Sequence, residues 1–479
     1  MGKPQVAVVG GGITGLITAH RLAGAGFDVT LVEAGDRLGG QVRTEDFAGL
    51  PVDSGAEALH LAGPHLPELL DRLGLSDEVV RARSGSARIW DGQRLRPLPA
   101  GVGPTGPTRL MPVVRSRVMS PRGLARAAME PLVGRSDVES DQSVGAFLDR
   151  RFGSEVVDRF VDPLLGNLHG GDVRRLSLQA VAPFLAQQAS DHRSLILAAR
   201  ARKGGGPPAF GNFNGGLASL IDALTDHPGI SIRVSTPVSA LVVEPERRTG
   251  GDRTSDRGGV GRGPRMRYRL EGIDGVWDGV ALAVPASVSA RILAPGVGEV
   301  FEELDDIPTA SVATVLAAFP RSTVEDHPGF QANGLLVTSR AGRLLKAATF
   351  LTRKWPHLDH PDHFVVRLSA GRARDHRVEQ LDDDDLVSRL LADLAAATGY
   401  HGSPTLTLVR RWPGAMAQLE VGHPERLAGV RQRLTRCPGL ALAGAAVDGL
   451  GIVSCTASAD RAAALIEAHL ADARGALVS

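Results

Sequence analysis

The chain has 479 residues, of which 43% are hydrophobic and 22% charged, and its formal net charge is +1. A balanced charge argues against nucleic acid or a generally acidic molecule as a partner. The chain is longer than a domain with a single hydrophobic core usually is, so we expect two or three lobes. The two cysteines, Cys437 and Cys455, are too few for a disulfide framework and favour a reducing compartment. The chain has no long apolar run and no room for a signal peptide before its first strand, which predicts a cytoplasmic protein.

The first forty residues predict a dinucleotide-binding turn. Residues 6–9 have the β-branched and small side chains of a buried strand, and a helical pattern follows the glycines Gly10, Gly12 and Gly15. This spacing lets the backbone approach a pyrophosphate at a helix N-terminus, where free N–H groups favour anions. Glu33 ends the next predicted strand, at the distance where an acidic residue binds a ribose hydroxyl.

The middle of the chain predicts a helical insertion between pieces of this nucleotide domain. Residues 66–74 form an amphipathic helical pattern that stops at a glycine. Residues 95–120 are rich in proline, glycine and arginine, with apolar residues between them. Helical patterns then cover residues 143–151 and run from 176 to about 201.

The nucleotide domain resumes after this insertion. Residues 213–224 predict a turn into a helix, and residues 230–244 predict strands. Residues 245–265 have no apolar periodicity and predict a mobile hairpin loop. A strand over 276–285 ends in Ala-Val-Pro, which suits a strand that runs up to a ligand.

The last third predicts an antiparallel sheet and a return to the nucleotide domain. Its four strand-like runs are 310–319, 334–338, 346–350 and 364–369. A helix with an acidic first turn follows from Asp382 to about Thr398, and the acids suit its dipole. A strand over 439–444 and a helix from Ser454 onwards would bring a second helix N-terminus near the cofactor.

Together these elements predict five segments. They are a first part of the nucleotide domain over 1–90, a helical lobe at the pocket mouth over 91–205, a second nucleotide part over 206–295, a substrate domain over 296–424, and a third nucleotide part over 425–479.

The N-terminal motifs resemble those of the flavin amine oxidase superfamily, whose members bind FAD. Further segments resemble the protoporphyrinogen and coproporphyrinogen oxidases, closest to the soluble type of Gram-positive bacteria. The segments that carry this narrower resemblance are 55–58, 120–126, 161–166, 345–357, 411–423 and 442–455.

This resemblance implies an α/β fold, with a Rossmann-like FAD-binding domain, an antiparallel-sheet substrate domain and a helical lobe. It also implies an oxidase that passes hydride from a porphyrinogen to flavin N5 and electrons to molecular oxygen, releasing hydrogen peroxide, with coproporphyrinogen III ahead of protoporphyrinogen IX. The residues that it assigns to FAD are Gly10, Gly11, Gly12, Ile13, Thr14, Gly15, Glu33, Ala34, Arg37, Gly39, Gly40, Gln41, Arg43, Gly55, Ala56, Glu57, Ala58, Val238, Trp412, Gly444, Ala445, Gly451, Ile452 and Val453.

The candidate substrate pocket departs from the family pattern. The pocket candidates are Asn167, His169, Thr349, Trp412 and Gln418, and the departures fall at Gly63, Asn167, His169, Leu419, Val447 and Val453. These departures leave a second hypothesis open, a paralogue that oxidises a different small molecule, such as an amine-containing intermediate. A flavin-binding protein without turnover is a third, and the intact cofactor motifs argue against it.

Other features have simpler interpretations. His357, His360 and His363 resemble metal ligands in content, but prolines interrupt the segment and favour a solvated loop, so no metal is expected. Cys455 is interpreted as a buried structural thiol and not as a reactive one. Lys346 is not assigned a role beside the flavin. The lobe over 95–135 is compatible with peripheral membrane contact or with a solvated cover of the pocket mouth. Both a monomer and a homodimer fit the sequence.

Overall fold

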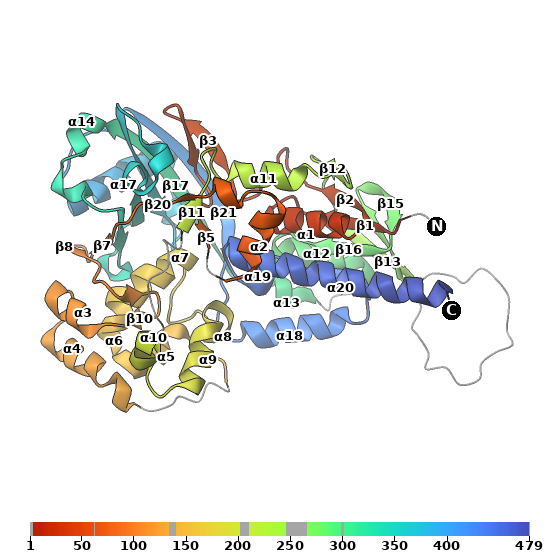
Figure 1. Cartoon of the computed structure of the whole chain (residues 1–479), viewed down its shortest axis with the longest axis horizontal. Helices are drawn as coiled ribbons and strands as arrows, with labels where there is room; N and C mark the ends of the chain where they lie inside the picture. Colours follow the sequence, from red (N-terminus) through yellow and green to blue (C-terminus); the bar gives the residue numbers. More distant parts are fainter. Residues whose placement is uncertain are drawn as a thin grey trace. The chain divides into compact units, whose positions relative to one another are not determined.

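The computed structural model describes residues 3–61, 63–133, 140–201, 210–245, 266–297 and 301–478. The chain divides into two compact units (Figure 1). Unit 1 comprises 1–40, 220–307 and 425–479, and unit 2 comprises 41–219 and 308–424. This division is coarser than the five segments expected from the sequence.

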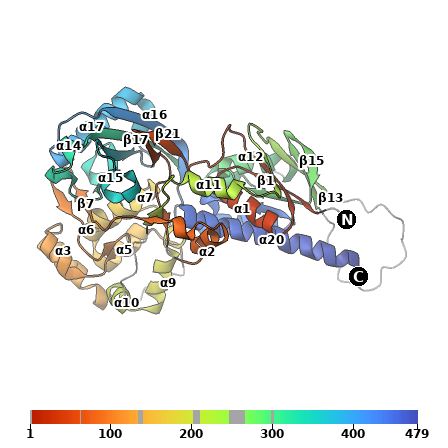
Figure 2. The same cartoon turned by 45° about the horizontal axis from the view of Figure 1, so that its top comes forward.

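Unit 1 contains a five-stranded parallel sheet. Its strands, in spatial order, are β12 (Ile230–Arg233), β2 (Asp28–Val32), β1 (Gln5–Val9), β16 (Gly279–Leu282) and β22 (Leu440–Leu442). The central strands β1 and β16 are almost entirely buried, as their continuous apolar runs require for a sheet covered on both faces. Helix α1 (Ile13–Gly24) packs against α20 (Ile452–Val478), and the two lie side by side in Figures 1 and 2.

A second, antiparallel sheet belongs to the same unit. It consists of β13 (Ala240–Pro245), β14 (Met266–Glu271) and β15 (Ile273–Trp277). The single strand expected over 276–285 is wrong in detail, because Asp278 separates β15 from β16 and its carboxylate accepts a 2.9 Å hydrogen bond from the Gln5 N–H. Pro245 ends β13, and the rest of the expected loop, 246–265, lies outside the described residues. The remaining helices are α12 (Ala286–Val297), α13 (Glu302–Asp305), α18 (His423–Leu434) and α19 (Ala445–Asp448).

Unit 2 is built on a seven-stranded sheet. Its order is β21 (Leu406–Ala417), β17 (Thr309–Pro320), β20 (His363–Ala370), β19 (Leu345–Phe350), β18 (Gly334–Val337), β7 (Ala87–Trp90) and β8 (Leu95–Pro97). All neighbours are antiparallel except β18 and β7, which are parallel. The four strands expected from the sequence are present, whereas β21, β7 and β8 were not expected.

The two faces of this sheet differ in chemistry. One face packs on α17 (Asp383–Thr398), where Phe350, Leu386 and Leu390 share one buried core. The Asp382 carboxylate caps α17 by accepting a hydrogen bond of 2.8 Å from the Asp385 N–H, which confirms the expected helix start. The opposite face carries Arg367, which alternates along β20 with core residues. The polar face is therefore available for a site.

Unit 2 has further, smaller elements. They are the hairpin β3 (Thr44–Phe47) and β4 (Leu50–Asp53), the small sheet of β5 (Leu59–His60), β11 (Phe210–Asn212) and β6 (Val80–Arg81), the pair β9 (Val102–Gly103) and β10 (Gly106–Pro107), the helices α2 (His65–Arg72), α14 (Arg321–Val324), α15 (Leu351–Lys354) and α16 (Arg377–Gln380), and short 3₁₀ turns at Ser76–Glu78, Glu130–Leu132, Pro328–Phe330, Ser339–Ala341 and Pro356–Leu358. Helix α11 (Ala218–Thr225) begins in unit 2 and belongs to unit 1 from Leu220 onwards.

The helical lobe of unit 2 confirms the expected insertion of helices. It comprises α3 (Leu110–Ser116), α4 (Pro121–Ala128), α5 (Val144–Phe152), α6 (Ser154–Val156), a π-helix (Val157–Gly166), α7 (Asn167–His169), α8 (Leu178–Val181), α9 (Pro183–Asp191) and α10 (Leu195–Ala201). The continuous helix expected over 176–201 is wrong. It breaks into three because Pro183 cannot donate a helical hydrogen bond and because Ser194 starts a new helix, accepting a bond from the Leu197 N–H.

The π-helix Val157–Gly166 leads directly into residues 167–171. Pro163 lies within it and lacks the N–H that a regular α-helix would use. Gly170 ends α7 with a φ of +56°, a left-handed conformation that glycine adopts without strain. Irregular helices of this type are frequent at functional sites.

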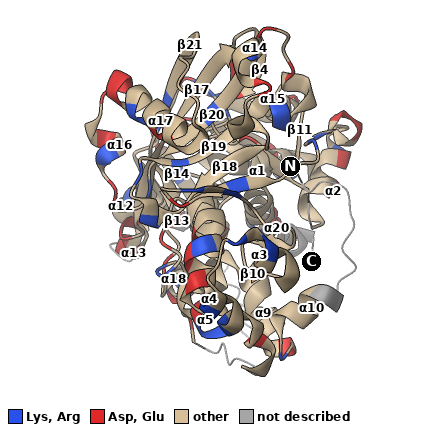
Figure 3. Ribbon diagram, turned by 90° about the vertical axis from the view of Figure 1, so that its left-hand side faces the viewer, with Lys and Arg blue, Asp and Glu red and all other residues tan. Residues whose placement is uncertain are grey.

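Among the described helices, none is long and apolar enough to cross a membrane. Basic and acidic segments are interspersed along the helices and strands in the view of Figure 3. The charge distribution in this view therefore agrees with the near-neutral composition.

Candidate functional site

The glycine-rich turn of unit 1 leaves a space at the N-terminus of α1. A Cβ at Gly15 would lie 1.8 Å from the Gly10 carbonyl oxygen, and one at Gly10 would lie 2.5 Å from the Ala283 carbonyl oxygen. A Cβ at Gly12, by contrast, would meet no atom within 4 Å. The backbone is therefore tightly packed on the protein side and open at Gly12, as a cradle for a pyrophosphate requires.

Glu33 follows β2 and faces this turn. Its carboxylate oxygens accept hydrogen bonds of 2.7 Å from the N–H groups of Gly11 and Gly35. A carboxylate can accept more than one hydrogen bond on each oxygen, so both remain able to bind ribose hydroxyls. The Arg37 guanidinium donates to the Leu38 and Gly40 carbonyls and thereby fixes the next loop. The residues present thus fit the adenosine side of a dinucleotide.

The last strand of unit 1 leads to a second open helix start. Gly444 and Gly451 have φ of +125° and +93°, and a Cβ at either would meet no atom within 4 Å. Helix α20 begins at Ile452, so its first N–H groups lack helical partners and can donate to an anionic or carbonyl oxygen. Ala445 starts the short α19, and Val453 is half-buried in the first turn of α20.

Other predicted FAD residues of unit 1 have less distinctive surroundings. Ala34 is exposed, and Val238 is half-buried before β13. The Gly39 N–H donates to the Gly11 carbonyl over 2.8 Å, while Ile13 and Thr14 occupy the first turn of α1. No contact of these side chains assigns a particular part of the cofactor to them.

In unit 2, the segment from Ser54 to Glu57 crosses the polar face of the seven-stranded sheet. The Thr314 hydroxyl donates to the Ser54 carbonyl over 2.7 Å, and the Arg367 guanidinium donates to the Gly55 carbonyl over 2.5 Å. A Cβ at Gly55 would lie 2.0 Å from the Gln41 carbonyl oxygen and 3.2 Å from the Trp412 ring. Only glycine fits there.

Glu57 is the ionic centre of this segment. Its carboxylate accepts from Lys354 Nζ at 2.7 Å, from Trp355 Nε1 at 3.1 Å and from Arg367 at 3.2 Å. Burial by itself raises the pKa of Glu57, but the positive charges of Lys354 and Arg367 outweigh burial and bring the pKa to about 2. Glu57 is therefore a buried anion held by two cations.

The remaining predicted FAD residues of unit 2 flank Gly55. The Ala56 N–H donates to the Gln41 carbonyl, and the Gln41 amide donates to the Ala415 carbonyl over 2.8 Å. Arg43 pairs with Glu45 at 2.6 Å. Ala58 packs beside a small apolar core next to the sheet.

Four of the five pocket candidates lie along the polar face or at its end. Thr349 on β19 is half-buried and pairs in register with Arg367 of β20. Trp412 on β21 is also half-buried, and its Nε1 lies 3.4 Å from the Thr314 hydroxyl. His169 and Gln418 contact each other, because the Gln418 amide donates to the His169 carbonyl over 3.0 Å.

The side-chain amide of the fifth candidate, Asn167, forms hydrogen bonds with other parts of the protein. The amide nitrogen donates to the Val337 carbonyl over 3.0 Å and to the Lys346 carbonyl over 2.8 Å, and the amide oxygen accepts from Arg372 over 3.3 Å. Both donors are thus occupied by main-chain carbonyls. This geometry favours a buried, satisfied polar residue over one that polarises a substrate.

Replacing Asn167 with leucine is therefore expected to destabilise the protein by about 2 kcal/mol, because a similar volume remains but a buried carbonyl and Arg372 lose their partner. The midpoint of urea unfolding measures this effect. Leu168→Ala is the matched control, since the neighbouring Leu168 side chain is 63% exposed. Equal stability of the two variants would contradict the structural role of Asn167.

The positions that depart from the family pattern have mixed surroundings. Gly63 is exposed with a φ of +86°, so a basic side chain there would be strained. Leu419 is buried, whereas Val447 is half-buried within α19. The departures therefore do not form one cluster of chemically similar positions.

Sequence reasoning missed the cations that surround the polar face. Lys346, Lys354, Arg367 and Arg372 come from separated strands and loops, and no linear motif marks them as a group. One signal was present, since Lys346 is the charged residue of a largely apolar strand in a chain with 4 lysines. From the sequence, only a role beside the flavin was considered for Lys346, and that role was not assigned.

Two further predictions concern metals and thiols. Among the described residues, no group of three or more His, Cys, Asp or Glu side chains is arranged to hold a metal ion. Burial lowers the pKa of His357 to about 4, and neither of its ring nitrogens has a hydrogen-bond partner in the described part of the chain. Burial raises the pKa of the Cys455 thiol, as expected for a structural rather than a reactive cysteine.

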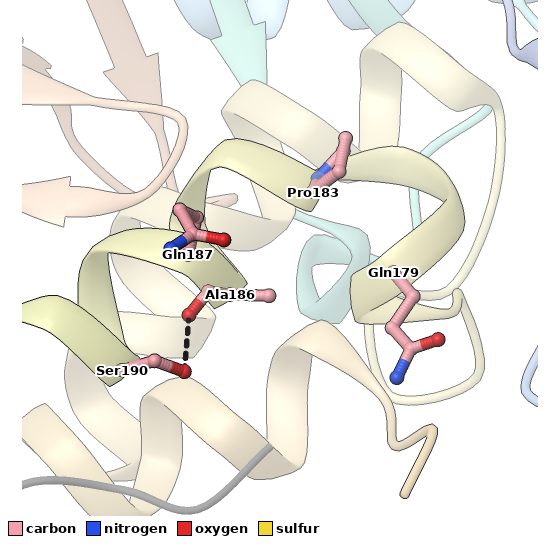
Figure 4. A pocket seen from close by; sticks show the side chains of 5 residues that line it. All are labelled: Gln179, Pro183, Ala186, Gln187 and Ser190. Carbon is pink, nitrogen blue, oxygen red and sulfur yellow. Dashed lines mark hydrogen bonds between the residues drawn. The ribbon is translucent and has the colours of Figure 1, made fainter. Parts of the chain in front are cut away.

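A depression on the lobe has little chemical content. It is lined by Gln179, Pro183, Ala186, Gln187 and Ser190 of α8, α9 and the residues between them (Figure 4). The Ser190 hydroxyl donates to the Ala186 carbonyl, as the dashed line shows. None of its lining side chains titrates near neutral pH, so this depression does not suit the expected chemistry.

A glycine cradle at a helix N-terminus, an acidic residue after the second strand and a separate sheet with a polar face define a dinucleotide-dependent oxidoreductase. The family model that matches residues 13–467 is described as flavin containing amine oxidoreductase. The chain belongs to this family, and its cofactor is FAD.

Individual relatives extend this result over the whole chain. The chain is 30% identical to a coproporphyrinogen III oxidase of Bacillus subtilis over 95% of this chain and 96% of the relative. It is 35% identical to a coproporphyrinogen III oxidase of Mycobacterium leprae over 98% of this chain and 100% of the relative. A crystal structure from Exiguobacterium, provisionally assigned as a protoporphyrinogen oxidase, superposes with a TM-score of 0.82 at 28% identity and covers 98% of this chain and 99% of its own.

Proposed function

We propose that the protein is an oxygen-using FAD oxidase that dehydrogenates a porphyrinogen to the porphyrin, with coproporphyrinogen III ahead of protoporphyrinogen IX. The observation that carries this proposal is the full-length similarity, at 30% and 35% identity, to two proteins named coproporphyrinogen III oxidase. The fold alone would not choose a substrate, because one fold can host many reactions.

Bound FAD would supply the redox chemistry, namely acceptance of hydride from the substrate and reduction of oxygen to hydrogen peroxide. The chain supplies binding and electrostatics. Gly12 leaves room for the pyrophosphate, and Glu33 has acceptor capacity for the ribose. The first-turn N–H groups of α20, beginning at Ile452, supply donors where negative charge develops.

Aerobic turnover of coproporphyrinogen III by the purified yellow protein tests the proposal. Porphyrin fluorescence and hydrogen peroxide are followed together. We expect both to rise in a fixed ratio, three peroxides for each porphyrin, and far faster than in buffer with free FAD. Porphyrin formation no faster than in that control would refute the proposed substrate class.

The alternative, a paralogue that oxidises another small molecule, depends on the departures in the pocket. Asn167 no longer supports it, because both of its donors bind main-chain carbonyls. We therefore retain the porphyrinogen as the proposed substrate.

We propose a cytoplasmic location for the enzyme, and for the lobe either a solvated cover of the pocket mouth or peripheral membrane contact. Met111, Met129, Leu132 and Phe184 of the lobe are each more than half exposed. Arginines alternate with apolar residues in this part of the chain, a combination that suits an interfacial surface. Sedimentation with anionic vesicles tests the contact, and an unchanged supernatant fraction would refute it. Both a monomer and a homodimer remain compatible with the proposal.

A further inference from the structure

Lys346 carries a buried amine without a counter-ion. Its side chain belongs to β19, and the residue is 7% exposed. In the described part of the chain, no hydrogen bond or ion pair joins its ammonium group to another residue. Burial, followed by the positive charges of Arg372 and Arg367, lowers the pKa of Lys346 to about 7.

The nearby arginines are already engaged. Arg367 binds Glu57 and the Gly55 carbonyl. Arg372 binds the Asn167 amide oxygen and the Val337 carbonyl. Neither arginine therefore needs Lys346 or shares a carboxylate with it.

The carboxylates whose charges act on Arg372 are engaged as well. Asp162 accepts from the Ser339 N–H at 2.8 Å, and Asp375 pairs with Arg377 at 2.6 Å. Asp393 accepts from the Leu344 and Leu345 N–H groups and pairs with Arg343. The region thus holds three neighbouring cations, Lys346, Arg367 and Arg372. Both guanidinium groups have hydrogen-bond partners, whereas the ammonium of Lys346 has none among the described residues.

Two other buried polar groups border the turn formed by residues 169–171. His169 is 6% exposed, and its Nδ1 has no hydrogen-bond partner among the described residues. Gln418 is 1% exposed, and its Oε1 is likewise unpartnered in the described structure. Unsatisfied groups of this kind are rare in folded proteins because each costs free energy, so they indicate a missing ligand or water.

The glycines of this turn bring the backbone close to both groups. A Cβ at Gly170 would lie 3.7 Å from Lys346 Nζ, and a Cβ at Gly171 would lie 2.3 Å from Gln418 Oε1. Lys346 and Gln418 therefore approach the same two-glycine turn, on which His169 also lies. All of these residues belong to unit 2.

We propose that Lys346 binds a carboxylate of the substrate at the 169–171 turn, with His169 Nδ1 as a further hydrogen-bond donor. This inference rests on the proposed function, because it assigns the carboxylate to an acidic side chain of the porphyrinogen. One carboxylate supplies the single negative charge that Lys346 lacks. An N⁺–H···O⁻ hydrogen bond in a buried site is stronger than one between neutral groups. Lys346 is on this account a specificity-determining residue, not a proton-transfer group.

The first test observes Lys346 without any turnover. Protein labelled with ¹⁵N-lysine has signals from only 4 side chains, Lys3, Lys203, Lys346 and Lys354. The Lys346→Met variant identifies the Lys346 signal, and sodium propionate serves as the carboxylate probe. We expect propionate to raise the pKa of Lys346 by about one unit, with saturation, because an anion favours the charged amine. A response no larger than that of the exposed Lys3 would overturn the inference.

The second test compares binding of coproporphyrin III with its tetramethyl ester, by quenching of porphyrin fluorescence. Lys346→Met should weaken binding of the acid about tenfold and leave binding of the ester unchanged, whereas Lys346→Arg should retain most of the preference for the acid. Arg340→Met is the matched control, since it also removes one positive charge but from a side chain that is 70% exposed. Lys346→Met is expected to fold, because an apolar side chain replaces a buried unpaired amine.

The outcomes separate this inference from the proposed function. If the wild type oxidises coproporphyrinogen III but Lys346→Met binds acid and ester as the wild type does, the inference is wrong and the proposed function stands. If propionate raises the pKa of Lys346 but neither porphyrin binds, the carboxylate site stands and the porphyrinogen is the wrong ligand.

Discussion

Replacing Gly12 with valine is expected to give a folded protein that binds FAD at least about 100-fold more weakly than the wild type. A Cβ at Gly12 meets no protein atom within 4 Å, so the added side chain is tolerated by the fold. It would extend instead into the space at the N-terminus of α1, where the pyrophosphate would bind. A loss of about 3 kcal/mol of binding corresponds to this factor. The measurement is the ratio of flavin to protein absorbance, followed by titration with FAD.

Gly24→Val is the matched control for this experiment. Gly24 lies at the other end of α1, and a Cβ there also meets no atom within 4 Å. Circular dichroism and thermal unfolding show whether both variants are folded. If Gly12→Val retained flavin as Gly24→Val does, the open space at Gly12 would not be the pyrophosphate site.

The second large effect is expected at Glu57. Glu57→Gln should reduce the free energy of unfolding by about 3 kcal/mol, because the ammonium of Lys354 and the guanidinium of Arg367 are left partly buried without their carboxylate. Chemical denaturation at pH 7 measures the difference. Glu325→Gln is the control, because Glu325 also pairs with an arginine, Arg321, but its side chain is 47% exposed. Equal effects of the two substitutions would contradict the importance of the buried cluster.

The same cluster predicts the acid sensitivity of the fold. The pKa of Glu57 is about 2 in the folded chain and about 4.5 when it is unperturbed. A depressed carboxyl pKa stabilises the fold above the unfolded value, and this stabilisation is lost as the pH falls from about 4.5 towards 2. The difference corresponds to about 3 kcal/mol. Glu57→Gln should flatten the dependence of stability on pH in this window, and an unchanged slope would refute the assignment.

Local patterns predicted much of the fold. The turn after β1, the start of α17 and four strands of the large sheet follow from periodicity, glycine spacing and the acids of a first helical turn. The break between α8 and α9 depends on Pro183, and the break between α9 and α10 on the new helix start at Ser194. The helical pattern over 176–201 did not predict either break. The parallel pairing of β7 with β18 joins residues 247 positions apart, Ala87 and Gly334, and local patterns do not determine such a pairing.

The candidate site was predictable on its nucleotide side and less so on its substrate side. Gly10, Gly12, Gly15 and Glu33 lie within one short strand–turn–helix unit, whose spacing carries the information. The cations around the polar face are brought together by the pairing of β19 with β20 and by the helix and loop that follow these strands. Asn167 illustrates the limit, because its residue type suggested a substrate contact, whereas its donors bind two main-chain carbonyls that sequence cannot locate.

The most direct test of the central claim is the anaerobic reduction of the bound flavin by coproporphyrinogen III. Without oxygen, the absorbance of the oxidised flavin reports electron transfer from the donor alone. We predict rapid bleaching by coproporphyrinogen III, none by a simple diamine such as putrescine, and recovery of the colour when air is admitted. A flavin that stays oxidised with the porphyrinogen, or that is bleached by the diamine instead, would contradict the proposed function.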